Sequence, residues 1–193
     1  MKSFLLLTLL FVPIEILGKF TPFFEQDLRN DLTAEEKYQL KQDSTLTKSF
    51  LLDYIKGTAM ITLNRNSEIN FKYLGDWFIN CDSSTTDKAN CLELSFDSNG
   101  FLVKEVHYSK EGILSSEAFL NNNSEGKFKY TFIAKRYDKK GNLIKIENKA
   151  SEKPPLMGNF NWKDYKYHGM VKKYNRKGKL ISSYEFDYGE KVR

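Results

Sequence analysis

The same seven-residue pattern occurs four times in this chain, and no other feature constrains the fold as strongly. Each copy runs aromatic, then Asp, Ser or Asn, two further residues, Gly, any residue and Leu; the copies begin at Phe96, Tyr108, Tyr137 and Tyr174. Asp, Asn and Ser suit the first position of a type I turn, and glycine suits the left-handed position after it. A type I turn closed by such a glycine and a bulge is a favoured hairpin loop. Each copy therefore predicts strand, turn, strand.

Apolar residues alternate with polar ones on both sides of these turns, as in the segments 92–96, 128–132 and 180–186. This period of two is typical of strands that bury one face. Short turns between successive strands make sequence neighbours pair antiparallel. We expect a mainly β protein, an antiparallel β-meander of about eight or more strands. It would form an open twisted sheet or an up-and-down barrel over residues 58–193, with an N-terminal helical segment packed on it.

Residues 19–57 are expected to supply that helical segment. Thr33 and Glu36 form a capping box, which predicts a helix of about ten residues that fades near Asp43. A second helix is predicted from apolar residues that recur at helical spacing, with Gly57 placed to end it: Leu46, Phe50, Leu51, Tyr54 and Ile55.

Residues 1–18 have the pattern of a secretory signal peptide, with Lys2 before a short apolar run. An uncleaved anchor or a buried N-terminal segment is the alternative. No stretch of the mature chain is long and apolar enough to span a bilayer. Export to the periplasm or outside the cell makes a disulfide between Cys81 and Cys91 the expected state of the two cysteines, and closing this loop contributes about 2–3 kcal/mol.

Charge is distributed unevenly along the chain. Residues 19–126 have 11 Lys and Arg against 17 Asp and Glu, a net of −6, and residues 127–193 have 18 against 7, a net of +11. A basic half on an exported protein predicts a protein or an anionic envelope surface as partner. The alternative is a solvated lysine face that protects sheet edges. The predicted contact residues are Lys172, Lys173, Arg176, Lys177 and Lys179.

The segment 149–166 interrupts the strand pattern with Pro154 and Pro155, and it contains Phe160 and Trp162. Aromatic residues on a long loop predict partner contact, so we add Phe160 and Trp162 to the predicted contact residues. The alternative is a lid whose aromatic side chains pack back over the core.

Catalytic chemistry is not predicted. The chain has two histidines, His107 and His168, and lacks the common nucleophile, phosphate-loop and metal-ligand motifs. We therefore predict no catalytic residue, no metal and no cofactor. The basic half could suit nucleic acid, but export argues against such a partner.

Two resemblances add to these expectations. The segment His168–Leu180, followed by a turn around Gly189, resembles the variant MORN repeat of YwqK-like proteins, which implies an antitoxin or immunity-type role. The segment Leu74–Gly100, with Gly75-Asp76-Trp77, is similar to the opening of small lipocalin-like proteins, which implies a carrier of a small apolar ligand. The residues themselves favour an exported, non-enzymatic binding protein of the cell envelope, with these two roles as alternatives.

Overall fold

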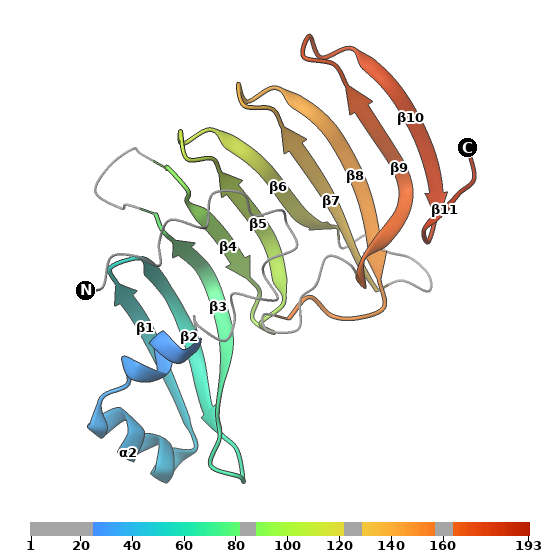
Figure 1. Ribbon diagram of the computed structural model, residues 1–193. Helices are drawn as coiled ribbons and strands as arrows, with labels where there is room; N and C mark the ends of the chain where they lie inside the picture. Colours follow the sequence, from blue (N-terminus) through green and yellow to red (C-terminus); the bar gives the residue numbers. More distant parts are fainter. Residues whose placement is uncertain (1–24, 82–87, 122–128, 157–163) are drawn as a thin grey trace.

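The computed structural model describes residues 25–81, 88–121, 129–156 and 164–193, and the predicted signal peptide lies outside them. In the described part of the chain, 11 strands form one sheet in the order of the sequence, each antiparallel to the next. Figure 1 shows the sheet as a continuous meander from β1 to β11. The sheet is open, with β1 at one edge and β10 with β11 at the other. The predicted β-meander is confirmed in its open form.

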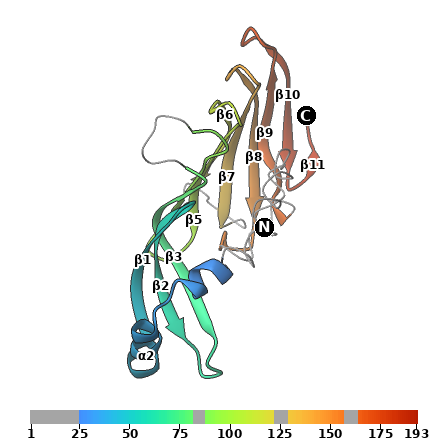
Figure 2. The same cartoon turned by 60° about the vertical axis from the view of Figure 1, so that its left-hand side comes forward.

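Apart from the short β4 and β11, the strands have 7 to 11 residues each. Their bounds are β1 Thr45–Leu52, β2 Ile55–Leu63, β3 Ile69–Ile79, β4 Leu92–Phe96, β5 Leu102–Tyr108, β6 Leu114–Asn121, β7 Tyr130–Tyr137, β8 Leu143–Ser151, β9 Lys166–Tyr174, β10 Leu180–Asp187 and β11 Glu190–Lys191. Figure 2 shows how strongly the sheet twists between its first and last hairpins. Such a twist follows from the right-handed twist of each strand.

The helix predicted from the capping box is present as α2, Ala34–Asp43. The Thr33 hydroxyl accepts from the Glu36 amide at 3.1 Å, and the Glu36 carboxylate accepts from the Thr33 amide at 2.8 Å. Ser44 ends the helix in a left-handed conformation. A shorter helix covers residues 25–30. None of the described helices has the length and apolar character needed to cross a bilayer.

The second predicted helix is wrong, because its residues form the β1–β2 hairpin. Phe50 and Leu46 share a face four residues apart in a strand as they would in a helix, so this spacing does not separate the two structures. Lys48 hides the alternation, since it lies between them on the same face. Its ammonium group lies 3.0 Å from Asp31 and 2.8 Å from Glu36, which come from the helical segment above it.

The main core lies between the helical segment and the first strands, around Trp77. The Trp77 side chain is fully buried against Phe50 and Tyr73, with ring centroids 6.1 Å and 5.1 Å away, and its indole N–H donates to the Thr58 carbonyl at 3.1 Å. Gly57 lies in β2 beneath the ring, where a Cβ atom would overlap the indole. Gly57 therefore does not end a helix; it makes room for Trp77. Further core residues on these elements are Leu28, Leu32, Leu40, Ile55, Ala59, Ile61 and Leu94.

All four repeated turns have the predicted geometry. Gly100, Gly112, Gly141 and Gly178 have φ between 72° and 81°, and each amide donates to the first residue of its turn at 2.9–3.0 Å. The strand register shifts beside each turn, as the predicted bulge requires.

Candidate interaction surface

Three of the repeated turns lie at the same end of the sheet (Figure 1). They join β5 to β6, β7 to β8 and β9 to β10, and alternate connections of a meander fall on one end. We call residues 109–112, 138–141 and 175–179 together the turn row. Side chains lock each turn from within: the Asn175 side-chain oxygen accepts from the amides of Lys177 at 2.9 Å and Lys179 at 3.0 Å. The two residues before the glycine of each turn are exposed.

Neighbouring turns in the row are close in space. A Cβ atom at Gly141 would lie 3.5 Å from Cγ2 of Ile113, which follows the first turn. The charge of Arg176 in the third turn contributes to the lowered pKa of Asp138 in the second. Successive hairpins of a sheet lie about 10 Å apart, since each strand adds about 4.8 Å. The three turns therefore form one continuous strip of surface.

This strip is basic. It contains Lys110, Lys139, Lys140, Arg176, Lys177 and Lys179, all exposed, against Glu111 and Asp138. Lys110 lies 3.6 Å from Glu111. The Asp138 carboxylate is hydrogen-bonded within its own turn, where it accepts from the backbone amides of Asn142 at 3.0 Å and Lys140 at 2.9 Å. These hydrogen bonds, together with the charge of Arg176, lower the pKa of Asp138, so it stays ionised. The six cations of the strip still outnumber its two carboxylates.

The five basic residues predicted to contact a partner do not form one patch. Arg176, Lys177 and Lys179 lie in the turn row. Lys172 and Lys173 are consecutive in β9, so their side chains point to opposite faces of the sheet. The structure thus brings together three of the five. Lys139 and Lys140, which the sequence reasoning did not single out, complete the strip.

The predicted aromatic contacts, Phe160 and Trp162, lie outside the described residues. The parts of this loop that the structure describes pack on the sheet. The Pro155 carbonyl accepts from the Leu102 amide at 2.8 Å, and the Tyr165 ring lies 5.4 Å from that of Phe132. The base of the loop is therefore part of the core.

A second group of cations lies on one face of the C-terminal strands, above tyrosine rings. Lys145 and Lys149 each place their ammonium group 5.4 Å from the Tyr167 ring centroid, and Lys191 lies 3.9 Å from that of Tyr184. Contacts of this kind hold an ammonium group in place. Lys145 is also paired with the Glu147 carboxylate at 2.6 Å. The alternation along β8 puts Lys145 and Lys149 on one face. The strand register places Tyr167 of β9 opposite Lys149 and Lys191 of β11 opposite Phe186.

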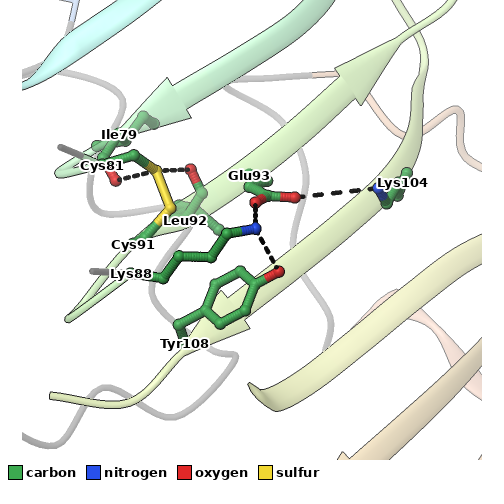
Figure 3. The surroundings of a disulfide bond; sticks show 8 residues. All are labelled: Ile79, Cys81, Lys88, Cys91, Leu92, Glu93, Lys104 and Tyr108. Carbon is green, nitrogen blue, oxygen red and sulfur yellow. Dashed lines mark hydrogen bonds and ion pairs between the residues drawn. A yellow bond between two sulfur atoms is a disulfide. The ribbon is translucent and has the colours of Figure 1, made fainter. Parts of the chain in front are cut away.

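The cysteines are joined as predicted. Cys81 and Cys91 form a disulfide with a Cα–Cα distance of 4.5 Å (Figure 3). Lys88, three residues before Cys91, donates to Glu93 at 2.7 Å and to the Tyr108 hydroxyl at 3.0 Å. These contacts tie the described end of the disulfide loop to β4 and β5.

Both histidines of the chain lie among the described residues. His107 hydrogen-bonds to the buried Glu105, and Ser116 lies opposite His107 on β6. No hydrogen bond joins Ser116 to His107 within the described ranges. The same ranges contain no group of three or more His, Cys, Asp or Glu residues that could hold a metal ion.

Comparisons with known proteins found no match among protein-family models, curated proteins or solved structures. The resemblances to YwqK-like and lipocalin-like proteins therefore remain expectations.

Proposed function

We propose that this chain is an exported, non-enzymatic binding protein of the cell envelope, which contacts an anionic surface through the turn row. The observation that supports this most directly is the alignment of three basic turns at one end of the sheet. The repeat places the turns there, and the residues between its fixed positions supply the charge.

The spacing of the charges favours a surface as partner over a single small anion. Lys139 and Lys140 sit on one turn, and Arg176 and Lys177 on the next. Turns about 10 Å apart are separated by slightly more than the Debye length of about 8 Å at physiological ionic strength, so each turn acts largely through its own charges. An extended anionic surface can contact all of the turns at once, whereas a small anion can contact only one. Basic residues of this kind attract an anionic partner and raise the rate of encounter.

Two features support export. Residues 1–18 have the pattern of a signal peptide. The disulfide between Cys81 and Cys91 suits an oxidising compartment outside the cytoplasm. The carrier alternative draws no support from the open sheet that the described residues form, because a carrier of this type would enclose its ligand.

Charge reversal in the turn row tests the proposal. The test variant has Arg176→Glu, Lys177→Glu and Lys179→Glu, and the matched control has Lys37→Glu, Lys56→Glu and Arg65→Glu. All six residues are exposed, and both variants change the net charge equally. The readout is retention of the folded, disulfide-bonded protein on a resin with an immobilised sulfated polysaccharide, eluted with salt.

We expect the wild type and the control to elute at similarly high salt, and the turn-row variant to elute much earlier. Each lysine or arginine near an anionic surface contributes about 1 kcal/mol, so three reversals are expected to remove most of the retention. Equal loss in both variants would show that net charge alone causes retention. That outcome, or a wild type that is not retained, would overturn the proposal.

A further inference from the structure

Leu180 and Ile181 are large aliphatic residues exposed at the base of the third turn of the turn row. Their exposed fractions are 48% and 66%. Leu180 is the final leucine of the repeated pattern, and its counterparts are more buried: Leu102 is 1% exposed, and Leu114 and Leu143 are half-buried. The last copy of the repeat therefore differs from the other three in what it leaves open to solvent.

The cause is the position of β10 at the edge of the sheet. Leu102, Leu114 and Leu143 begin strands that have neighbours on both sides, whereas β10 pairs on its outer side only with β11. That pairing involves Phe186 and Asp187, at the far end of β10. Nothing in the described residues covers Leu180 and Ile181.

Ile181 is the extra residue of the bulge between Leu180 and Ser182, which interrupts the alternation that would otherwise put the two side chains on opposite faces of the sheet. Basic residues lie next to this aliphatic pair in the hairpin. Arg176, Lys177 and Lys179 precede it in the same hairpin, and all three are exposed. The β9–β10 turn is the outermost point of the sheet in both views, at the end opposite α2 (Figures 1 and 2). A protruding tip with cations beside aliphatic groups suits the boundary of a bilayer, where anionic headgroups lie above acyl chains.

We propose that the β9–β10 tip docks on an anionic lipid bilayer, with Leu180 and Ile181 entering the boundary between headgroups and acyl chains. This inference rests on the proposed function and names its surface. A polysaccharide would offer Arg176, Lys177 and Lys179 the same negative charge, but it has no apolar layer for Leu180 and Ile181. The lipid therefore accounts for both features of the tip.

A second copy of the chain is a poorer occupant of this edge. In parallel pairing with β10 of another molecule, the two sets of Arg176, Lys177 and Lys179 would lie together, and like charges directly opposed across such an edge are destabilising. In antiparallel pairing, the start of β10 would lie beside Phe186 and Asp187 of the other copy, which already pair with β11. The register shift between Leu180 and Ser182 also bends the strand where it would have to pair.

Vesicle sedimentation tests the inference. The full, disulfide-bonded protein is mixed with vesicles of phosphatidylcholine and phosphatidylglycerol, or of phosphatidylcholine alone. The test variant has Leu180→Ser and Ile181→Ser. The control has Leu51→Ser, which changes a 78% exposed leucine of the opposite edge strand β1. The sulfated-polysaccharide resin is run on the same proteins.

We expect wild type and Leu51→Ser to bind the anionic vesicles and not the neutral ones. The double variant is expected to bind the anionic vesicles about tenfold more weakly, since two aliphatic side chains no longer leave water. Its retention on the polysaccharide resin should not change, because the cations remain.

Resin retention without vesicle binding would overturn the lipid inference and leave the proposed function standing. A wild type that binds neither the resin nor the vesicles would overturn both the lipid inference and the proposed function. Vesicle binding that the double variant retains in full would show attraction by charge alone, without insertion, and would also overturn the inference. Size-exclusion chromatography at several protein concentrations tests self-association. A molecular mass that rises with concentration for the wild type, but not for the double variant, would assign the edge to a second copy and overturn the inference.

Discussion

At the scale of the residue, Glu147 shows how a charged side chain can be buried within a basic face. It is fully buried, with Arg136 at 3.0 Å and Lys145 at 2.6 Å. Burial by itself raises the pKa of Glu147, but hydrogen bonds from Lys145 and Tyr167 and the charge of Arg136 outweigh it and hold the pKa below its usual range. The carboxylate thus holds together cations from β7 and β8 that would otherwise repel each other.

This arrangement predicts how stability depends on pH. Because folding lowers the pKa of Glu147, the ionised carboxylate stabilises the folded state at any pH above the pKa that Glu has in the unfolded chain, about 4.3. This stabilisation is lost as the pH falls through the lower pKa of the folded state. At neutral pH we expect Glu147→Gln to cost about 2–3 kcal/mol, less than a pair buried on both sides, since Arg136 and Lys145 reach water. Urea unfolding at neutral and acidic pH measures both effects. The variant should lose less stability on acidification than the wild type; equal losses would contradict the assignment, and Glu185→Gln on the surface serves as control.

At the scale of the element, the β2–β3 turn belongs with the four repeated turns although it lacks their glycine. The Asn64 side-chain oxygen accepts from the amides of Asn66 and Glu68, both at 2.9 Å, as Asn175 does in the last copy. Ser67 occupies the position of the glycine, with φ of 62°. A residue with a Cβ atom is strained in that conformation, so this turn has the same design with a less suitable residue.

Ser67→Gly is therefore expected to stabilise the protein by about 0.5–1 kcal/mol. Gly178→Ala is the opposite change in the matching position, where a Cβ atom would meet nothing within 4 Å and φ is 76°. It should destabilise by about 1 kcal/mol through backbone strain alone. Thermal unfolding followed by circular dichroism compares the two. A Ser67→Gly variant that melts below the wild type would show that the two turns differ in more than this residue.

At the scale of the whole molecule, stability should decline along the sheet from its first strands to its last. Helix α2 packs against β1 and β2, and the fully buried Trp77 of β3 and Phe50 of β1 contact each other in the same part of the sheet. No residue of β10 is buried. Regions with few buried apolar contacts open locally without global unfolding.

Hydrogen exchange followed by mass spectrometry should show this gradient. We expect the amides of β2 and β3 to exchange slowest, close to the rate set by global unfolding, and those of β10 to exchange much faster. Reduction of the disulfide should speed exchange in β3 and β4, which it joins, more than in β9 and β10. Uniform protection across the sheet would contradict the gradient and would imply cover over the last hairpin.

The sequence by itself determined the local structure. Each turn depends on an Asn, Asp or Ser and a glycine within five residues, and the α2 helix depends on Thr33 and Glu36. Such short-range hydrogen bonds need no knowledge of the rest of the chain, so the meander and the capped helix could be predicted. The cysteine pair could be predicted because the chain has two cysteines and the signal-peptide pattern indicates an oxidising compartment. The basic character of the last hairpins was also visible, since charge is read directly from residue types.

Tertiary structure decided what those elements face. The spacing of Leu46 and Phe50 fits a helix and a strand equally, and pairing with β2 makes this segment a strand. Lys48 can then lie on the buried face because it pairs with Asp31 and Glu36. The open form of the sheet arises from how its twisted strands accumulate, which no single turn encodes. The turn row exists because alternate turns of an open meander reach the same end, and Leu180 is exposed because the sheet stops at β10. Both are properties of neighbours in space, which a local sequence pattern does not contain.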